Sequence, residues 1–263
     1  MTVACLGPEG TVSHAVAERL FGDDIILLPT IRSVFSYVED GKGDGLVPVE
    51  NSEAGGVGET MEGFRRTNVY ITGELPETVC HYLASDVGLN EISVLYAHPQ
   101  THEQCSDFTD SLGIPVVHTA SNAASVDSAL KIENAGALTS LAAAGLRDLP
   151  VIRREVQNSS DNVTRFVVIS GRLNVPQKPE KCSILVDPHS DRAGLLHDLL
   201  SVFRKRDINL SRIESRPSKR GMGSYVFFID FNAEKGWKDV VDELGQIADL
   251  KNLGCYNRLQ ERK

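Results

Sequence analysis

A hydroxyl and a guanidinium stand side by side at Thr164 and Arg165, directly before the apolar run of residues 166–169. The run predicts a buried strand, and open α/β sheets bind small ligands at the ends of such strands. An arginine can hold a carboxylate with two parallel hydrogen bonds, and a neighbouring hydroxyl can donate a hydrogen bond or a proton. Taken alone, the pair is better explained as the polar start of a surface strand, so its role depends on the rest of the chain.

Three other polar segments follow predicted strands and are candidates to line the same cleft. They are Gly-Pro-Glu-Gly-Thr-Val-Ser-His at residues 7–14, Pro-Val-Glu-Asn-Ser at residues 48–52 and His-Pro-Gln at residues 98–100. In the first segment, glycines let a ligand approach the backbone, and the N–H groups of the following helix attract anions. It is neither a Walker loop nor a dinucleotide fingerprint, so we expect no nucleotide there. An ordinary capped turn is the structural alternative.

The side chains in these segments can position a substrate without a cofactor. Asn51 and Ser52 can donate hydrogen bonds, whereas Glu50 can orient a donor or hold a proton but would repel an anion placed against it. A cap and turn before the helix predicted near residue 58 explains the same cluster equally well. His98 is expected to position substrate or cap its corner rather than to act as an acid or base, because no carboxylate partner follows it. The sequence shows no metal-binding constellation and no Ser-His-Asp arrangement.

The composition is that of a globular protein of 263 residues, long enough for two domains. The net charge of −9 argues against nucleic acid or an anionic membrane as the main partner, so an anionic substrate would depend on local donors. The five cysteines are scattered without metal-binding spacing, and we expect reduced thiols in a cytoplasmic protein. No targeting segment and no run of about 20 apolar residues is visible.

Hydrophobic patterning predicts two kinds of domain. Through residue 171, short apolar strands alternate with helical segments, one of them a helix predicted over residues 101–111. This alternation indicates α/β layers around a largely parallel sheet. Residues 172–181 are polar and contain two prolines, as expected for a linker. From residue 182 onward the order is strand, helix, strand, strand, helix, strand, which is typical of a small ferredoxin-like module. A glycine-containing turn is predicted at residues 219–223, between the second and third of these strands.

The polar segments, taken in order, resemble the motifs of a known family. Gly-Pro-Glu-Gly-Thr, Pro-Val-Glu-Asn-Ser, His-Pro-Gln and the Asn-Val-Thr-Arg-Phe of residues 162–166 resemble prephenate dehydratase. The segment Asn-Leu-Ser-Arg-Ile-Glu-Ser-Arg-Pro at residues 209–217 resembles the ACT regulatory domain attached to that enzyme. Each motif alone is weak, but the ordered set is specific and covers nearly the whole chain.

The resemblance implies conversion of prephenate to phenylpyruvate, with loss of carbon dioxide and water, in L-phenylalanine biosynthesis. It implies a catalytic domain over residues 1–171, made of two α/β subdomains like those of type 2 periplasmic binding proteins with the active site between them, and an ACT domain over residues 182–263. The threonine of Thr-Arg-Phe is essential in the family, which implies a catalytic role for Thr164, with Arg165 as a carboxylate contact. The implied substrate-binding residues are Arg165, Phe166, Glu50, Asn51, Ser52, His98, Gln100, Thr11 and Ser13.

The resemblance also implies regulation. The family binds L-phenylalanine between paired ACT domains, so feedback inhibition and a dimer or tetramer are expected. The implied effector-binding residues are Gly194, Leu195, Leu196, Asn209, Leu210, Glu214, Ser215, Arg216 and Pro217. Leu195 replaces a small alanine of the family, while Val12, Gly56 and Val163 replace a common aromatic residue, a serine and a threonine. These departures change the expected lining of the two binding sites, not the expected reaction.

Two alternatives stay open from the sequence. Arogenate differs from prephenate by an amino group in place of the keto oxygen, and the sequence does not separate the two substrates. A non-catalytic amino-acid-sensing or solute-binding protein would use the same two-lobed fold. The hydroxyl of Thr164 and the lack of a visible secretion signal favour the enzyme.

Overall fold

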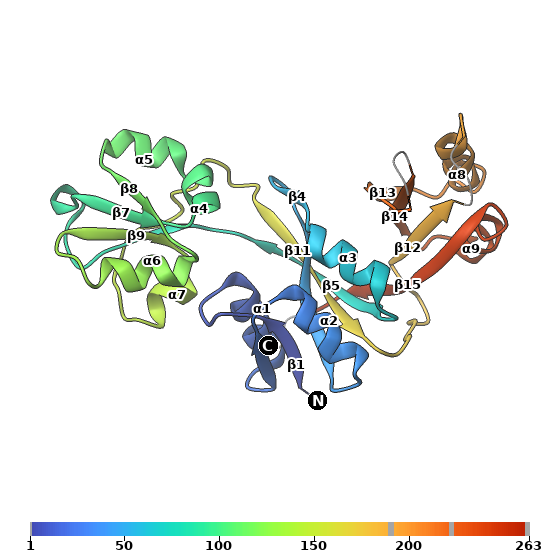
Figure 1. Ribbon diagram of the computed structural model, residues 1–263, viewed down its shortest axis with the longest axis horizontal. Helices are drawn as coiled ribbons and strands as arrows, with labels where there is room; N and C mark the ends of the chain where they lie inside the picture. The colour runs from blue at the N-terminus through green and yellow to red at the C-terminus, as the bar shows by residue number, and fades with distance from the viewer. Residues whose placement is uncertain (1, 189–191, 221–223, 261–263) are drawn as a thin grey trace.

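The computed structural model describes residues 2–188, 192–220 and 224–260 as two lobes and a C-terminal module (Figure 1). The first lobe contains residues 3–78 and 163–170, the second lobe residues 82–153, and the C-terminal module residues 181–258. The chain leaves the first lobe after β5 and returns to it at β11, so two crossings connect the lobes. The expected fold class, two α/β subdomains followed by a ferredoxin-like module, is confirmed. Within the described part of the chain, no helix is long and apolar enough to cross a membrane.

The first lobe is built on a mixed sheet in the order β5–β11–β3–β1–β2. β1 pairs in parallel with β2 and β3, whereas β11 pairs antiparallel with β3 and β5. The largely parallel sheet predicted from the sequence is therefore wrong for this half, because β11 returns from the second lobe and runs against its neighbours. The elements are β1 (Val3–Leu6), α1 (Val12–Phe21), β2 (Ile25–Leu28), α2 (Ile31–Glu39), β3 (Asp44–Asn51), β4 (Gly55–Gly56), α3 (Gly58–Arg66), β5 (Tyr70–Thr78) and β11 (Val163–Ser170).

The second lobe has its own sheet in the order β10–β6–β9–β7–β8, which is mixed as well, because β6 pairs antiparallel with β9 and β10. Its elements are β6 (Tyr82–Ala84), the short 3₁₀ helix η1 (Leu89–Glu91), β7 (Val94–Ala97), α4 (Pro99–Gln104), α5 (Ser106–Leu112), β8 (Val116–His118), α6 (Asn122–Ala129), β9 (Ala135–Thr139), α7 (Leu141–Gly145) and β10 (Val151–Arg153). The sequence patterns miss β2, α7 and β10, which span three to five residues and are too short for a clear period. They also predict one helix where Cys105 separates α4 from α5.

The C-terminal module has the predicted βαββαβ order. Its elements are β12 (Lys181–Pro188), α8 (Leu195–Arg204), β13 (Leu210–Pro217), β14 (Tyr225–Asn232), α9 (Trp237–Leu244) and β15 (Ala248–Arg258). The turn predicted at residues 219–223 falls partly outside the described residues. The strand order β13–β14–β12–β15 continues into the first lobe, because the end of β15 pairs in parallel with β5. One sheet therefore joins the module to the lobe.

Alternate residues of β11 face opposite sides of this sheet, as strand geometry requires. Phe166 and Val168 pack in the core beneath α1. Val167 and Ile169 pack in the core beneath α2 and α3, which also contains residues of the C-terminal module. Neighbouring residues at the start of β11 must therefore point in opposite directions as well.

Cys182 and Cys255 form a disulfide inside the C-terminal module. The two residues are opposite each other on β12 and β15, with their Cα atoms 4.0 Å apart. The expectation of reduced thiols is wrong for this pair, because the sequence does not reveal the strand register that brings them together. Cys5, Cys80 and Cys105 are free. Burial raises the pKa of the Cys105 thiol to about 12, which fits a core residue rather than a nucleophile.

Candidate active site

A cavity of about 560 Å³ lies between the two lobes. This volume is in the range of small-molecule sites, roughly 300–1,000 Å³. Five residues named from the sequence line it, namely Thr11, Asn51, His98, Gln100 and Thr164. Other polar lining residues are His81, Thr101, Gln104, Ser121 and Asn122. None of the described residues that line the cavity is a lysine or an arginine.

Thr164 is held at the cavity wall by its cross-strand neighbour Asn51. The Nδ2 group of Asn51 donates to Thr164 Oγ1 at 2.9 Å and to Asn162 Oδ1 at 2.6 Å. The Oδ1 atom of Asn51 accepts the backbone N–H groups of Glu53 and Ala54, which fixes the orientation of the amide. Because the Thr164 oxygen accepts a hydrogen bond from Asn51, the Thr164 proton is available for a ligand in the cavity.

Four of the described helices begin at the cavity, and α1, α3 and α6 are the longer ones. The N-cap residues of α1, α3 and α6 are Thr11, Val57 and Ser121, and all three line it. Thr11 and Ser121 accept hydrogen bonds from backbone N–H groups of their own helices, whereas Val57 has no side-chain acceptor for α3. Helix N-termini attract anions through their N–H groups and their dipole. The cavity can therefore hold carboxylates without a basic side chain.

His98 forms part of the wall from the second lobe, at the N-cap of α4. Its Nδ1 accepts the Gln100 N–H at 3.3 Å, which leaves Nε2 as the donor of the neutral ring. Burial lowers the pKa of His98, and the nearby His118 lowers it further. The ring is therefore neutral near pH 7 and offers a hydrogen bond rather than a charge.

His81 is a second neutral histidine in this wall and is 3% exposed. Its Nε2 lies 2.7 Å from Gln104 Oε1, and its buried Nδ1 has no hydrogen-bond partner among the described residues. Burial lowers the pKa of His81 below its ordinary value of 6.5. The folded protein therefore resists protonation of this ring.

The lowered pKa of His81 makes folding stability depend on pH. As the pH falls below 6.5, the unfolded chain binds the proton first, so the folded state loses stability. We expect His81 to lower the free energy of unfolding by up to about 1.4 kcal/mol per pH unit in that window. Urea unfolding at several pH values from about 7.5 to about 5 measures the slope. His81→Gln should reduce the slope, and an identical slope in both proteins would contradict the prediction.

Comparison with known proteins places these residues in a family. The prephenate dehydratase family model matches residues 3–173, and the ACT domain model matches residues 184–249. The chain belongs to the prephenate dehydratase family. The bifunctional chorismate mutase/prephenate dehydratase of Pseudomonas aeruginosa is 37% identical over 268 residues, covering 97% of this chain and 73% of that protein.

Two further relatives match along nearly their whole length. The prephenate dehydratase of Methanocaldococcus jannaschii is 33% identical, with 94% of each chain covered. The crystal structure of prephenate dehydratase from Arthrobacter aurescens in complex with L-Phe has a TM-score of 0.89 to this chain at 26% identity. That match covers 100% of this chain and 92% of the other.

Within this prephenate dehydratase fold, Arg165 and Glu50 lie outside the cavity. Arg165 follows Thr164 on β11, so its side chain points to the opposite face of the sheet. Its Nε donates to Glu50 Oε1 at 2.6 Å. This placement does not support the expected contact between Arg165 and a substrate carboxylate, because the side chains of adjacent strand residues point to opposite faces of the sheet.

Ser52, Ser13 and Phe166 also lie outside the cavity lining. Ser52 joins the ends of β3 and β11, since its Oγ donates to Asp161 O at 2.8 Å and accepts the Val163 N–H at 2.9 Å. Ser13 is buried on α1, and Phe166 is buried in the core below that helix. These three residues support the walls that Thr11, Asn51 and Thr164 occupy.

The expected effector-binding residues of the ACT domain fall into three groups. Glu214 and Arg216 are half-buried against the first lobe, where Arg216 Nη2 donates to Gly56 O at 3.2 Å. Leu195 and Leu210 pack in the core of the module. The side chain that replaces the family's alanine at position 195 therefore fills space in this core. The exposed members of the set are Gly194, Leu196, Asn209, Ser215 and Pro217.

Sequence reasoning misses several polar residues of the cavity. Ser121 and Asn122 follow β8 and start α6, which is the strand-end signal that identified the other segments. Asn122 Oδ1 accepts the Thr101 hydroxyl at 2.8 Å, and both residues line the cavity. His81 has no comparable signal, because it lies in the crossing between β5 and β6.

Proposed function

We propose that the cavity between the lobes converts prephenate to phenylpyruvate with Thr164 as the catalytic residue. The observation that carries this proposal is the Thr164 hydroxyl, oriented by Asn51 at 2.9 Å at the cavity wall of a chain that belongs to the prephenate dehydratase family. A threonine hydroxyl is a poor acid in water. Its contribution therefore comes from fixed orientation in a preorganised site.

The proposed reaction removes two groups from a non-aromatic ring. The C–C bond to the ring carboxylate breaks and releases carbon dioxide, and its electron pair enters the ring. The C–O bond breaks at the same time, and the hydroxyl takes up one proton and leaves as water. The product ring is aromatic, so the reaction is strongly favourable without a nucleophile or cofactor. We assign the hydrogen bond to the departing hydroxyl to Thr164.

We assign the carboxylates of prephenate to neutral donors. The N-termini of α1, α3 and α6 open onto the cavity, and His98 offers its Nε2–H. The ring carboxylate loses its charge during the reaction. An arginine ion pair on that group would stabilise the substrate more than the transition state, which slows the step. A cavity with neutral donors suits this decarboxylation.

We also propose that L-phenylalanine regulates the enzyme through the ACT domain. A solved relative with the same architecture was crystallised with L-Phe. The exposed face of β13, with Ser215 and Pro217, is open to a ligand or a second copy. A dimer or tetramer and a cytoplasmic location stay predictions of the sequence. The location needs its own test, because disulfides such as Cys182–Cys255 are rare in the cytosol.

One assay tests the reaction and its regulation. The purified chain is given prephenate, and phenylpyruvate is followed by its absorbance. A parallel reaction follows phenylalanine formed from arogenate. We expect turnover of prephenate, and we expect added L-phenylalanine to lower the prephenate rate, because a ligand that binds one conformation better shifts the population.

The outcomes separate the alternatives. Faster turnover of arogenate than of prephenate assigns the chain as an arogenate dehydratase. Binding of aromatic acids without turnover of either substrate indicates a non-catalytic sensor. An unchanged rate over a full L-phenylalanine titration removes the proposed regulation and leaves the proposed reaction intact.

A further inference from the structure

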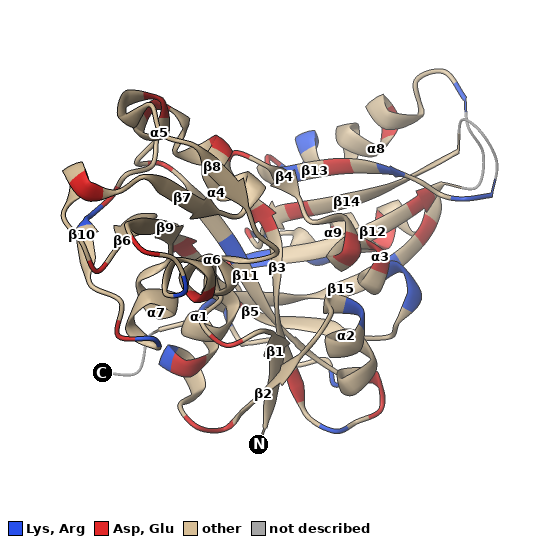
Figure 2. Cartoon of the chain, turned by 60° about the vertical axis from the view of Figure 1, so that its left-hand side comes forward, with Lys and Arg blue, Asp and Glu red and all other residues tan. Residues whose placement is uncertain are grey.

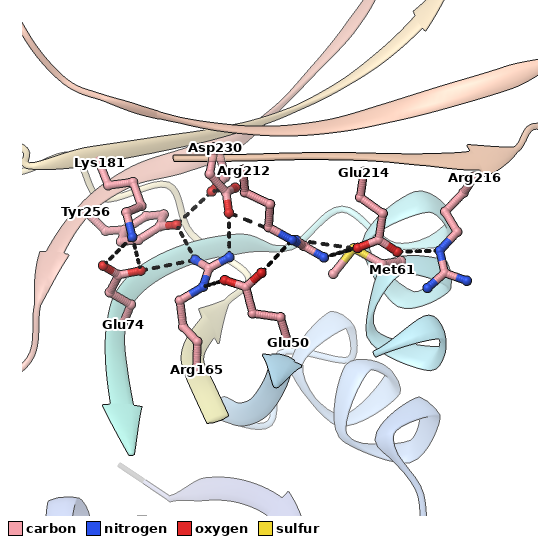
Figure 3. A network of polar contacts seen from close by, with 11 residues as sticks. Glu50, Met61, Glu74, Arg165, Lys181, Arg212, Glu214, Arg216, Asp230 and Tyr256 are labelled. Carbon is pink, nitrogen blue, oxygen red and sulfur yellow. Dashed lines mark hydrogen bonds and ion pairs between the residues drawn. The ribbon is translucent and has the colours of Figure 1, made fainter. Parts of the chain in front are cut away.

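Arg165 is buried on the face of β11 opposite Thr164, with 8% of its surface exposed. Its guanidinium contacts three carboxylates from three strands, which are Glu50 on β3, Glu74 on β5 and Asp230 on β14. Burial lowers the pKa of Arg165, but Asp230, Glu50 and Glu74 outweigh this effect and raise the pKa overall. The residue is therefore a fixed cation at the junction of the catalytic domain and the ACT domain (Figure 3).

Glu50 is shared between the two domains. Its Oε1 accepts Arg165 Nε at 2.6 Å, and its Oε2 pairs with Arg212 Nε at 2.8 Å. Arg212 belongs to β13 of the ACT domain, and its side chain is 10% exposed. Arg212 Nη1 also lies 4.0 Å from Asp230 Oδ2. Figure 3 shows the two guanidinium groups on either side of the Glu50 carboxylate.

These contacts form a balanced set of charges, which we call the charge network. It contains the cations Arg165, Lys181 and Arg212 and the carboxylates Glu50, Glu74 and Asp230. Neutral groups complete it, since Ser183 Oγ donates to Asp230 at 2.6 Å and lies 2.7 Å from the Tyr256 hydroxyl. Buried charges are tolerated when they are paired and hydrogen-bonded in this way.

The strand register connects the charge network to the active site. Thr164 pairs with Asn51 across β11 and β3, and the next pair along these strands is Arg165 with Glu50. The first pair faces the cavity and the second faces the ACT domain. The register then shifts at Pro48, which cannot donate to a strand ladder. Bulges of this kind often lie next to active sites, where they set the direction of a side chain.

A second contact joins the same face of β13 to the cavity wall. Both charge colours occur along β13 in Figure 2, and Arg212, Glu214 and Arg216 alternate on its half-buried face (Figure 3). The Glu214 carboxylate lies where a Cβ atom on Gly56 would stand, and Arg216 donates to Gly56 O. Gly56 itself lines the cavity. The inner face of β13 therefore contacts two segments of β3 and β4 that border the site.

We propose that Glu50 and Arg165 are positioning residues for Thr164 and that Arg212 of the ACT domain acts on catalysis through them. This inference rests on the proposed role of Thr164. The Glu50 carboxylate is held between two guanidinium groups, so removal of Arg212 leaves it attached from one side only. Because Glu50 is covalently next to Asn51, a shift of Glu50 moves the amide that orients the Thr164 hydroxyl.

The test compares single and double variants of the full chain. Arg212→Met and Glu50→Gln should each lower kcat for prephenate by between about tenfold and a hundredfold, the loss expected for an ångström-scale misplacement. KM should stay within about threefold, because neither residue contacts substrate. The double variant should lose no more than the worse single variant within about twofold, because both act through one contact.

Arg220→Met is the matched control. Arg220 is an arginine of the same ACT domain, and its ion pair with Asp187 stays inside that domain. Its kcat should equal that of the unmodified chain, while thermal unfolding reports any loss of stability in each variant. If Arg212→Met does not fold, the kcat of Glu50→Gln tests the proposal instead, because glutamine keeps the shape of the glutamate side chain.

Three results overturn the proposal. They are an unchanged kcat in folded Arg212→Met or Glu50→Gln, an equal loss in Arg220→Met, and losses that multiply in the double variant. Each leaves the proposed reaction standing, since the unmodified chain is still active. An inactive unmodified chain contradicts the proposed function instead.

Discussion

Replacing Thr164 with valine is expected to lower kcat by roughly 10²–10⁴-fold, the range of a positioned proton donor. Valine has the shape of threonine but no hydroxyl, so the leaving group would depart without its hydrogen bond. KM should change little, because we assign the substrate carboxylates to helix N-termini and not to Thr164. Steady-state rates of phenylpyruvate formation measure both constants.

Two variants sharpen this test. Thr164→Ser keeps a hydroxyl for Asn51 to orient and should recover most of the activity. Thr72→Val removes a threonine hydroxyl from the neighbouring strand β5. Thr72 Oγ1 donates a hydrogen bond of 3.4 Å to Val168 O, and Thr72 does not line the cavity. It should retain normal turnover. Near-normal kcat in Thr164→Val, or no recovery in Thr164→Ser, would remove Thr164 from the catalytic step.

The sequence predicts the elements of the site well because its signals are local. The polar segments after β1 and β7, at the end of β3 and at the start of β11 stand where the apolar periods end. The structure brings Thr11, Asn51, His98 and Thr164 from these segments to one cavity. Strand ends that open onto one interlobe space bring their side chains together. The βαββαβ order of the ACT domain follows from the same local periods.

The direction of each side chain is harder to predict than its segment. Thr164 and Arg165 are adjacent in the sequence, and a binding motif treats them as one unit. Strand geometry separates them, placing the hydroxyl at the cavity and the guanidinium against Glu50, Glu74 and Asp230. The alternation of side chains along a strand follows from the sequence. The sequence does not reveal that the ACT domain covers the face opposite Thr164, because this contact depends on the pairing of β15 with β5.

Nonlocal register explains the remaining errors. The Cys182–Cys255 disulfide depends on the pairing of β12 with β15. The antiparallel insertion of β11 depends on how the chain returns from the second lobe. Neither feature leaves a periodic signal, since both join residues more than 70 positions apart.

Replacing Asn51 with aspartate is expected to lower kcat/KM by on the order of 10²–10³-fold, comparable to loss of a preorganised donor. Aspartate keeps the two acceptor contacts to the Glu53 and Ala54 N–H groups but has no N–H for Thr164. The Thr164 hydroxyl would then donate to the new carboxylate, and its proton would no longer reach the substrate. The added negative charge also repels a dianionic substrate, so KM should rise as well as kcat fall.

Asn158→Asp is the matched control for this change. Asn158 Nδ2 donates to Ser106 Oγ at 2.9 Å, and its Oδ1 accepts the Asp107 N–H, so the same substitution removes donors and keeps an acceptor outside the cavity lining. Its steady-state constants should match those of the unmodified chain.

Asn51→Leu removes the donor without adding charge, so it separates the loss of the hydrogen bond from the effect of the added negative charge. It should reproduce the loss in kcat with a smaller change in KM. If Asn51→Asp retained normal kcat, the hydrogen bond from Asn51 would not set the direction of the Thr164 proton.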